Sequence, residues 1–177
     1  MVALCALVAM TATVLGYQLG KQPGRYRQGT VLLLKGGTTL LAAMLALYGA
    51  SRSGHPGHWW LFAGLVVCAA ADVALDLHFR LGMVVFALGH ACYITAFLLL
   101  APVQPVLLLV VLLAGRRLAA HMTEPVLPFQ LYGAVISAML ALAIGLRPMT
   151  AIGAVLFVIS DSLIFYRFVR PAGRVND

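Results

Sequence analysis

Residues 59–100 read WWLFAGLVVCAAADVALDLHFRLGMVVFALGHACYITAFLLL. Two apolar runs, at about residues 59–77 and 82–100, are separated only by a short polar segment that contains His78 and Arg80. Each run has about 20 residues, the length at which an α-helix crosses the hydrocarbon core of a bilayer. This stretch therefore predicts two antiparallel transmembrane helices joined by a tight connection.

The rest of the chain has the same apolar character. Of its 177 residues, 63% are hydrophobic and only 10% are charged, and the mean hydropathy is +1.01. A domain of this size has no interior large enough to bury so many apolar side chains, so lipid must be their solvent. We therefore predict an all-α membrane protein, a single polytopic domain over residues 1–177. Its compact bundle of about seven helices would use the apolar segments at about 2–19, 30–50, 59–77, 82–100, 102–119, 128–146 and 149–169.

The net charge of +7 does not indicate a nucleic-acid partner, because the basic residues lie between the apolar runs instead of forming a basic domain. One side of the predicted bundle carries nine of them: Lys21, Arg25, Arg27, Arg80, Arg116, Arg117, Arg167, Arg170 and Arg174. The other side carries Arg52 and Arg147. The positive-inside rule places the larger set, and with it the C-terminus, in the cytoplasm. The short loops are typical of a bacterial inner membrane protein and leave a eukaryotic membrane open.

Polar side chains inside the predicted helices lie at one level. With a rise of about 1.5 Å per residue, Lys35, Asp72 and Tyr132 lie about 6–7 Å from the cytoplasmic edge, and His90 and Asp161 about 12 Å. Ionisable residues inside a membrane helix are costly, and they commonly mark functional sites. Five different helices thus contribute to one layer, which predicts a single polar cavity open toward the cytoplasm.

Helical spacing supports this layer, although some members have simpler explanations. Asp72 and Asp76 share a helix face at i, i+4, and His90 and Tyr93 share one at i, i+3. Asp76 could equally mark a helix end in the headgroup region. An isolated His90 could be an ordinary hydrogen-bonding residue between helices. An ion pair between Lys35 and Asp72 could serve only to hold two helices together.

Four stretches together resemble a known family. Lys35 precedes Gly36, Asp72 lies in AAADVAL, Phe86 to Tyr93 read FALGHACY, and Gly153 to Ser162 read GAVLFVISDS. In this order they are similar to the pattern of the lysoplasmalogenase family, also called the YhhN family. The resemblance covers most of the chain, and its last segment is the most specific part. Members of that family typically have eight membrane spans, one more than this sequence predicts.

The resemblance implies a hydrolase that cleaves the vinyl ether bond of a lysoplasmalogen, a lysophospholipid held among membrane lipids, to a fatty aldehyde and a glycerophospho-base. It implies no cofactor. Such a reaction needs one carboxylic acid to protonate the β-carbon and a second carboxylate to stabilise the cation and activate water, as in glycoside hydrolysis. Apolar surroundings favour the protonated form of a carboxyl group, and a nearby ammonium favours the ionised form. Asp161 is therefore the expected proton donor and Asp72 its ionised partner, although the two roles could be exchanged.

The other polar residues of the layer are expected to orient substrate or water: Lys35, Asp76, His90, Tyr93, Tyr132 and Ser160. Ser160 adjoins Asp161 but lies on a neighbouring helix face. Arg80, Arg116 and Arg117 at the cytoplasmic rim could hold the substrate phosphate. The positive-inside rule explains these arginines too, and it is the stronger explanation. The cysteines show no metal-ligand spacing, so no metal site is predicted.

Two other functional classes remain open from the residues alone. A proton-coupled transporter or channel could use the same intramembrane Asp, His and Lys side chains. Against this reading, the outer half of the predicted bundle has no comparable polar residues to complete a path. A structural or assembly subunit would tolerate Asp161→Asn with a change in stability alone.

Overall fold

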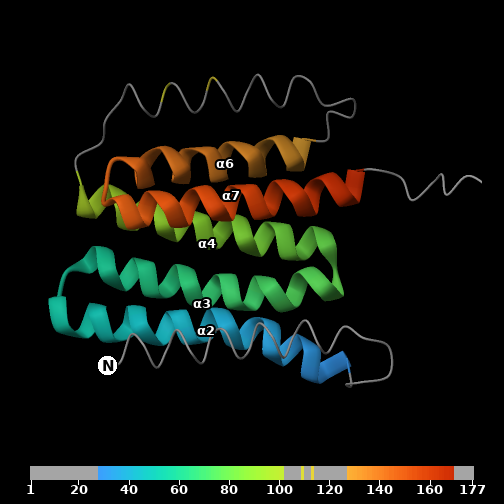
Figure 1. Ribbon diagram of the computed structural model, residues 1–177, viewed down its shortest axis with the longest axis horizontal. Coiled ribbons are helices and arrows are strands. Elements are labelled where there is room, and N and C mark those ends of the chain that lie inside the picture. The colour runs from blue at the N-terminus through green and yellow to red at the C-terminus, as the bar shows by residue number, and fades with distance from the viewer. Residues whose placement is uncertain (1–27, 102–108, 110–112, 114–126, 170–177) are drawn as a thin grey trace, which may run out of the picture.

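The structure is a computed structural model, which describes residues 28–101, 109, 113 and 127–169. Every secondary-structure element within this part of the chain is an α-helix (Figure 1). The helices are α2 (Gln28–Ser53), α3 (Pro56–Leu77), α4 (Phe79–Leu100), α6 (Leu127–Ile144) and α7 (Pro148–Val169). The prediction of an all-helical fold is thereby confirmed, and these helices coincide with five of the seven predicted segments. The predicted segments at 2–19 and 102–119 lie outside the described residues, apart from residues 109 and 113.

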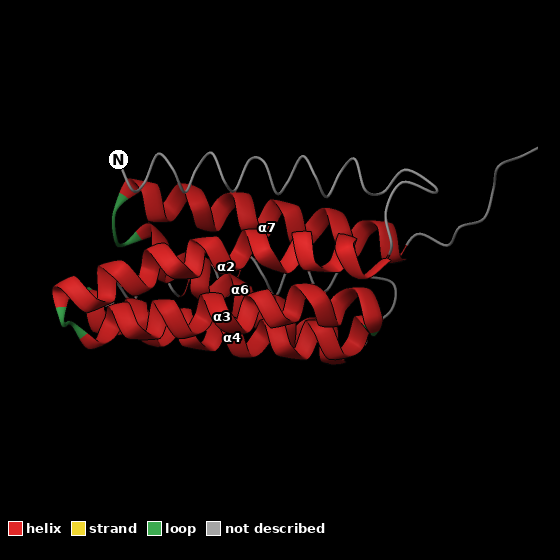
Figure 2. Ribbon diagram, turned by 90° about the horizontal axis from the view of Figure 1, so that it is seen from below, coloured by secondary structure: helices red, strands yellow, loops and turns green. Residues whose placement is uncertain are grey.

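The described helices lie alongside one another with their long axes in nearly the same direction (Figures 1 and 2). Helix α3 packs between α2 and α4, while α6 packs against both α4 and α7. Short connections at Gly54–His55, His78 and Gly145–Arg147 join α2 to α3, α3 to α4 and α6 to α7, so the two helices of each of these pairs run in opposite directions. Among the described helices, α3 and α4 are both long and apolar enough to cross a membrane, judged by length and composition.

The turn between α2 and α3 shows how local sequence sets a helix start. Gly54 adopts a φ of 63°, a left-handed conformation that suits glycine because it has no Cβ. His55 then caps α3, since its Nδ1 accepts a hydrogen bond from the backbone nitrogen of Gly57 at 3.1 Å. Pro56 occupies the first helical position, where its missing N–H leaves no helix bond unmade.

Helices α3 and α4 approach each other closely because glycines line their contact. A Cβ atom added at Gly64 would lie 3.1 Å from the carbonyl oxygen of Gly89. One added at Gly82 would lie 2.5 Å from the backbone nitrogen of Leu75. Small residues at such contacts let helix backbones meet in membranes. The two glycine contacts therefore fix how α4 is positioned along α3.

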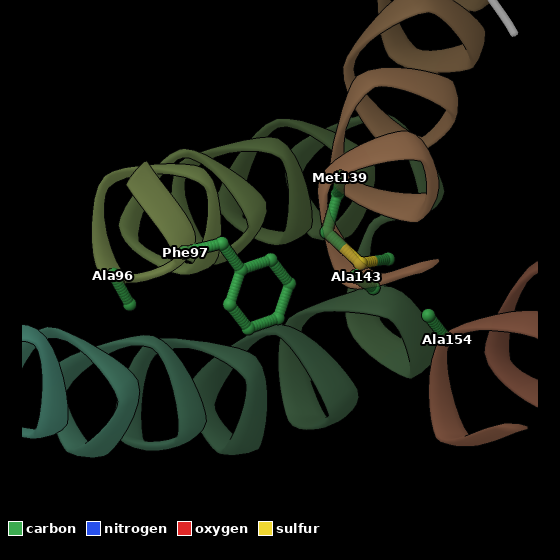
Figure 3. Close-up of a cluster of buried hydrophobic side chains, with 5 residues drawn as sticks. All are labelled: Ala96, Phe97, Met139, Ala143 and Ala154. Carbon is green, nitrogen blue, oxygen red and sulfur yellow. The ribbon is translucent and has the colours of Figure 1, made fainter. Parts of the chain in front are cut away.

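Two clusters of buried side chains form the interior. The first joins α4, α6 and α7 through Ala96, Phe97, Met139, Ala143 and Ala154 (Figure 3). It lies where α4 and α6 end and α7 begins. The phenyl ring of Phe97 points from α4 toward the side chain of Met139.

The second cluster lies toward the opposite end of the bundle, where α3 ends and α4 begins. It consists of Cys68, Ala71 and Phe86, and partly buried Tyr132 and Phe157 pack against it. Residues of the predicted polar layer border this second cluster, since Tyr93 and Tyr132 pack against it and Asp72 directly follows Ala71.

Candidate active site

Asp161 and Tyr132 connect α7 to α6. The phenol hydroxyl of Tyr132 donates a hydrogen bond to Oδ2 of Asp161, in a partly buried position. Tyr132 lies in the second turn of α6, and Asp161 lies in the second half of α7. Because the two helices are antiparallel, these positions meet at the same level. Tyr132 therefore bonds to Oδ2 of Asp161 and not to Oδ1.

Asp72 and Thr39 make a corresponding contact between α3 and α2. The hydroxyl of Thr39 donates to Oδ2 of Asp72 at 2.6 Å, and the bond is partly buried. Each of these two aspartates therefore accepts a hydrogen bond from a hydroxyl group on a neighbouring helix.

His90 lies at the middle of α4. Its side chain is 0% exposed, the only polar or charged side chain in the buried core of the described residues. Nδ1 lies 2.6 Å from the carbonyl oxygen of Phe86, one turn earlier in α4. Because a carbonyl oxygen can only accept, Nδ1 must carry a proton and donate this bond.

Aromatic rings from three helices surround the His90 imidazole. The ring centroid of Phe157 is nearest, at 4.7 Å, followed by those of Tyr93 at 5.8 Å, Tyr132 at 6.1 Å and Phe86 at 6.3 Å. Tyr132 therefore contacts His90 with its ring and Asp161 with its hydroxyl. The Tyr132 side chain therefore links His90 to the Asp161 carboxyl group.

Of the residues that the sequence singled out, the structure brings His90 together with Tyr93 and Tyr132 and joins Tyr132 to Asp161, while Asp72 directly follows Ala71 of the cluster against which both tyrosines pack. The cavity predicted there remains an expectation. Cys68, one turn before Asp72 on α3, is buried as expected for a small apolar side chain, and Tyr93 packs against the cluster that contains it.

Other predicted site residues are placed differently. Ser160 is exposed on α7 and Asp76 is exposed at the last turn of α3, so neither side chain is enclosed with the His90 group. Arg80 is exposed near the start of α4, at the end of the bundle where Asp72 lies. Lys35 belongs to α2, one helical turn before Thr39, and its side chain lies outside the described part. Arg116 and Arg117 lie outside the described residues.

Three residues of the site were not singled out by the sequence. Thr39, the hydroxyl donor to Asp72, lies one helical turn after Lys35 on α2. Phe86 and Phe157 looked like ordinary apolar helix residues. Each lies one turn before a polar site residue, Phe86 before His90 and Phe157 before Asp161, and this spacing was the available signal.

Sequence comparison supports the resemblance noted above. Residues 30–176 match the YhhN family. The chain belongs to the YhhN family. All the helices that carry the candidate site fall almost wholly within the matched region. Together with the apolar helices α3 and α4, this membership identifies an integral membrane protein.

The YhhN-family chain is also similar to curated mammalian proteins named lysoplasmalogenase TMEM86B. It is 35% identical to the Rattus norvegicus protein over 134 residues, covering 71% of this chain and 56% of the rat protein. It is 35% identical to the Homo sapiens protein over 124 residues, covering 65% of this chain and 54% of the human protein. The chain thus spans about half the length of the curated relatives it matches. No solved structure is significantly similar to it.

Proposed function

We propose that this protein is a membrane-embedded hydrolase that cleaves the vinyl ether bond of lysoplasmalogens. The observation that carries the proposal is the pair of carboxyl groups at one end of the bundle, Asp72 on α3 and Asp161 on α7. Each accepts a hydrogen bond from a hydroxyl group on the adjacent helix. Membership of the YhhN family and the name shared by the mammalian relatives support the substrate class.

The reaction begins with proton transfer to carbon. Asp161, in its neutral form, donates its proton to the β-carbon of the vinyl ether, and the resulting positive charge is shared between the α-carbon and the ether oxygen. Asp72, in its ionised form, stabilises this oxocarbenium ion electrostatically. The division of roles is part of the proposal and follows the paired-carboxyl logic of glycoside hydrolysis.

Water then completes the cleavage. As its oxygen forms a bond with the α-carbon, one of its protons passes to the Asp72 carboxylate, and a hemiacetal results. The bond between the α-carbon and the glycerol oxygen then breaks, and the glycerol oxygen takes the proton from Asp72. The hemiacetal hydroxyl returns its proton to Asp161, which releases the fatty aldehyde and restores both carboxyl groups to their starting forms.

The proposal includes the finer architecture predicted from the sequence. A bundle of about seven helices, with the site toward the cytoplasmic side, would admit the hydrocarbon chain between helices from the inner leaflet. The phosphate of the substrate would then lie near the rim where Arg80, Arg116 and Arg117 are expected. A lysophospholipid is the partner that this arrangement requires.

Release of aldehyde by the purified protein tests the activity. The protein should release aldehyde from a lysoplasmalogen and none from a lysolipid that carries a saturated ether of the same chain length. With D₂O as solvent, the trapped aldehyde should contain one deuterium on carbon 2, because that carbon receives the catalytic proton. Ion flux in proteoliposomes without any aldehyde release would instead favour the transporter class.

A further inference from the structure

The hydrogen bonding of His90 leaves one polar atom without a partner. Nδ1 donates to the Phe86 carbonyl oxygen at 2.6 Å, so in the neutral ring Nε2 carries a lone pair and can only accept a hydrogen bond. Nε2 is buried and has no hydrogen-bond partner among the described residues. Buried polar atoms rarely lack a hydrogen-bond partner unless a ligand supplies one or the atom has a functional role.

The surroundings of His90 indicate which kind of hydrogen-bond donor would fit at Nε2. Nε2 lies in the outer half of the imidazole ring, away from the bond that joins the ring to Cβ, and rings of α6 and α7 pack around this imidazole. The hydroxyl group of Tyr132, whose ring packs on His90, already donates to Asp161. A free water molecule in a buried site usually needs two to four polar partners. An aromatic enclosure with one available acceptor suits a hydroxyl group that is already attached to a bound lipid.

We propose that Nε2 of His90 accepts a hydrogen bond from the free hydroxyl group on the second glycerol carbon of the substrate, and that His90 thereby selects lysolipids. The inference rests on the proposed function, because a lysoplasmalogen carries this hydroxyl on the carbon next to the one that bears the vinyl ether. Binding it at His90 would hold the ether close to Asp161, whose hydrogen-bond donor Tyr132 packs on the His90 ring. A second acyl group at that carbon would remove the donor and add bulk where rings from three helices meet.

The enclosure also implies a movement on binding. His90 is fully covered, so the hydroxyl reaches Nε2 only when one covering ring turns aside. Phe157 has the nearest ring centroid, is only partly buried, and lies one turn from Asp161 on α7. We assign this movement to Phe157, which would couple lipid entry to the position of the acid.

Two substitutions separate the roles of the two ring nitrogens. In His90→Asn, the amide nitrogen can still donate to the Phe86 carbonyl oxygen, but the acceptor at the Nε2 position is lost. In His90→Gln, the longer side chain can place an amide oxygen near the Nε2 position. Thr95→Val serves as a control on the same helix, because the Thr95 hydroxyl donates to Ala91 of its own helix at 2.9 Å.

The experiment compares two vinyl ether substrates that differ only at the second glycerol carbon, one with the hydroxyl and one with hydrogen in its place. We expect the wild type and Thr95→Val to prefer the hydroxyl substrate by roughly tenfold to a hundredfold in kcat/KM, the range of one buried hydrogen bond. His90→Asn should process both substrates at nearly the same low rate, and His90→Gln should keep part of the preference. A wild type that ignores the hydroxyl overturns the inference. So does a His90→Asn variant that is slowed equally on both substrates, which would indicate a role toward water or in folding.

Binding measurements keep this inference distinguishable from the proposed function. Saturated-ether lysolipids with and without the hydroxyl are not cleaved by the proposed chemistry, and their binding can be followed by the shift in thermal unfolding. The hydroxyl lipid should stabilise the wild type more than the deoxy lipid, and this difference should vanish in His90→Asn. If no vinyl ether is cleaved, the proposed function fails, while the binding comparison still decides whether His90 recognises the hydroxyl. Equal stabilisation of the wild type by both lipids overturns the inference. If His90→Asn does not fold, the inference is decided by three results. These are the wild-type rates on the two vinyl ether substrates, the wild-type stabilisation by the two saturated-ether lipids, and the substrate preference of His90→Gln.

Discussion

The contact between α3 and α4 at Gly82 has no space for a side chain. A Cβ atom there would lie 2.5 Å from the backbone nitrogen of Leu75 and 2.7 Å from the Leu75 Cβ. These atoms are fixed to the α3 backbone, so Gly82→Ala forces the two helices apart, at a cost of about 1–3 kcal/mol typical of overpacking. Alanine regains about 1 kcal/mol of helix propensity. We therefore expect Gly82→Ala to lower the free energy of unfolding by up to about 2 kcal/mol.

Gly49→Ala on α2 is the matched control, since nothing lies within 4 Å of the position its Cβ would take. Gly49→Ala gains the same helix propensity without the steric cost. The difference in the free energy of unfolding between the two variants therefore measures the steric cost at the contact between α3 and α4. Unfolding of both proteins by denaturant titration in detergent measures that difference, which should be about 1–3 kcal/mol. Gly82→Ala should also slow aldehyde release, because moving α4 along α3 displaces His90 from Asp72. Equal stability and activity of the two variants would refute the reasoning.

Two further variants test the hydroxyl donors of the site. Tyr132→Phe removes the hydrogen bond to Asp161, which stabilises the negative charge that develops on this carboxyl group as it gives up its proton. The substitution should lower kcat by roughly tenfold to a hundredfold, the equivalent of about 1.5–3 kcal/mol for a bond to a charged group. Single-turnover aldehyde release measures this effect, and an unchanged rate would exclude a role for the phenol. Thr39→Val removes the donor to Asp72 without leaving a cavity, and should reduce activity about tenfold, corresponding to about 1.4 kcal/mol. Thr95→Val, whose hydroxyl bonds within its own helix, should behave like the wild type; equal losses in both threonine variants would contradict this assignment.

The level of each polar residue along its helix could be predicted from the sequence. Apolar runs have a required length in a membrane, so their ends show how deep Asp72, His90 and Asp161 lie. The structure brings His90 and Asp161 each into contact with Tyr132, while the depth of these residues in a membrane stays a prediction. That prediction relied on a fixed rise per residue, a local property of any helix.

The rotation of each helix about its axis could not be predicted in the same way. Ser160 is adjacent to Asp161, yet it is exposed while Asp161 is partly buried, because successive helical residues point in different directions. Which neighbouring helix supplies a hydrogen-bond donor also depends on packing between distant segments. The contacts of Thr39 with Asp72 and of Tyr132 with Asp161 span 33 and 29 residues of sequence. Phe157 has an apolar side chain typical of a lipid-facing position, and only the folded bundle shows that it covers His90.

The central claim is that Asp72 and Asp161 act together as the acid and base of vinyl ether cleavage. Aldehyde release from a lysoplasmalogen by the wild type, Asp72→Asn and Asp161→Asn tests it most directly, with each rate normalised to folded protein measured by thermal unfolding. Both substitutions keep the shape of the side chain, and each amide oxygen can still accept the hydroxyl hydrogen bond. We predict that both variants fold and that each releases no measurable aldehyde. Release at the wild-type rate by either folded variant would contradict the account.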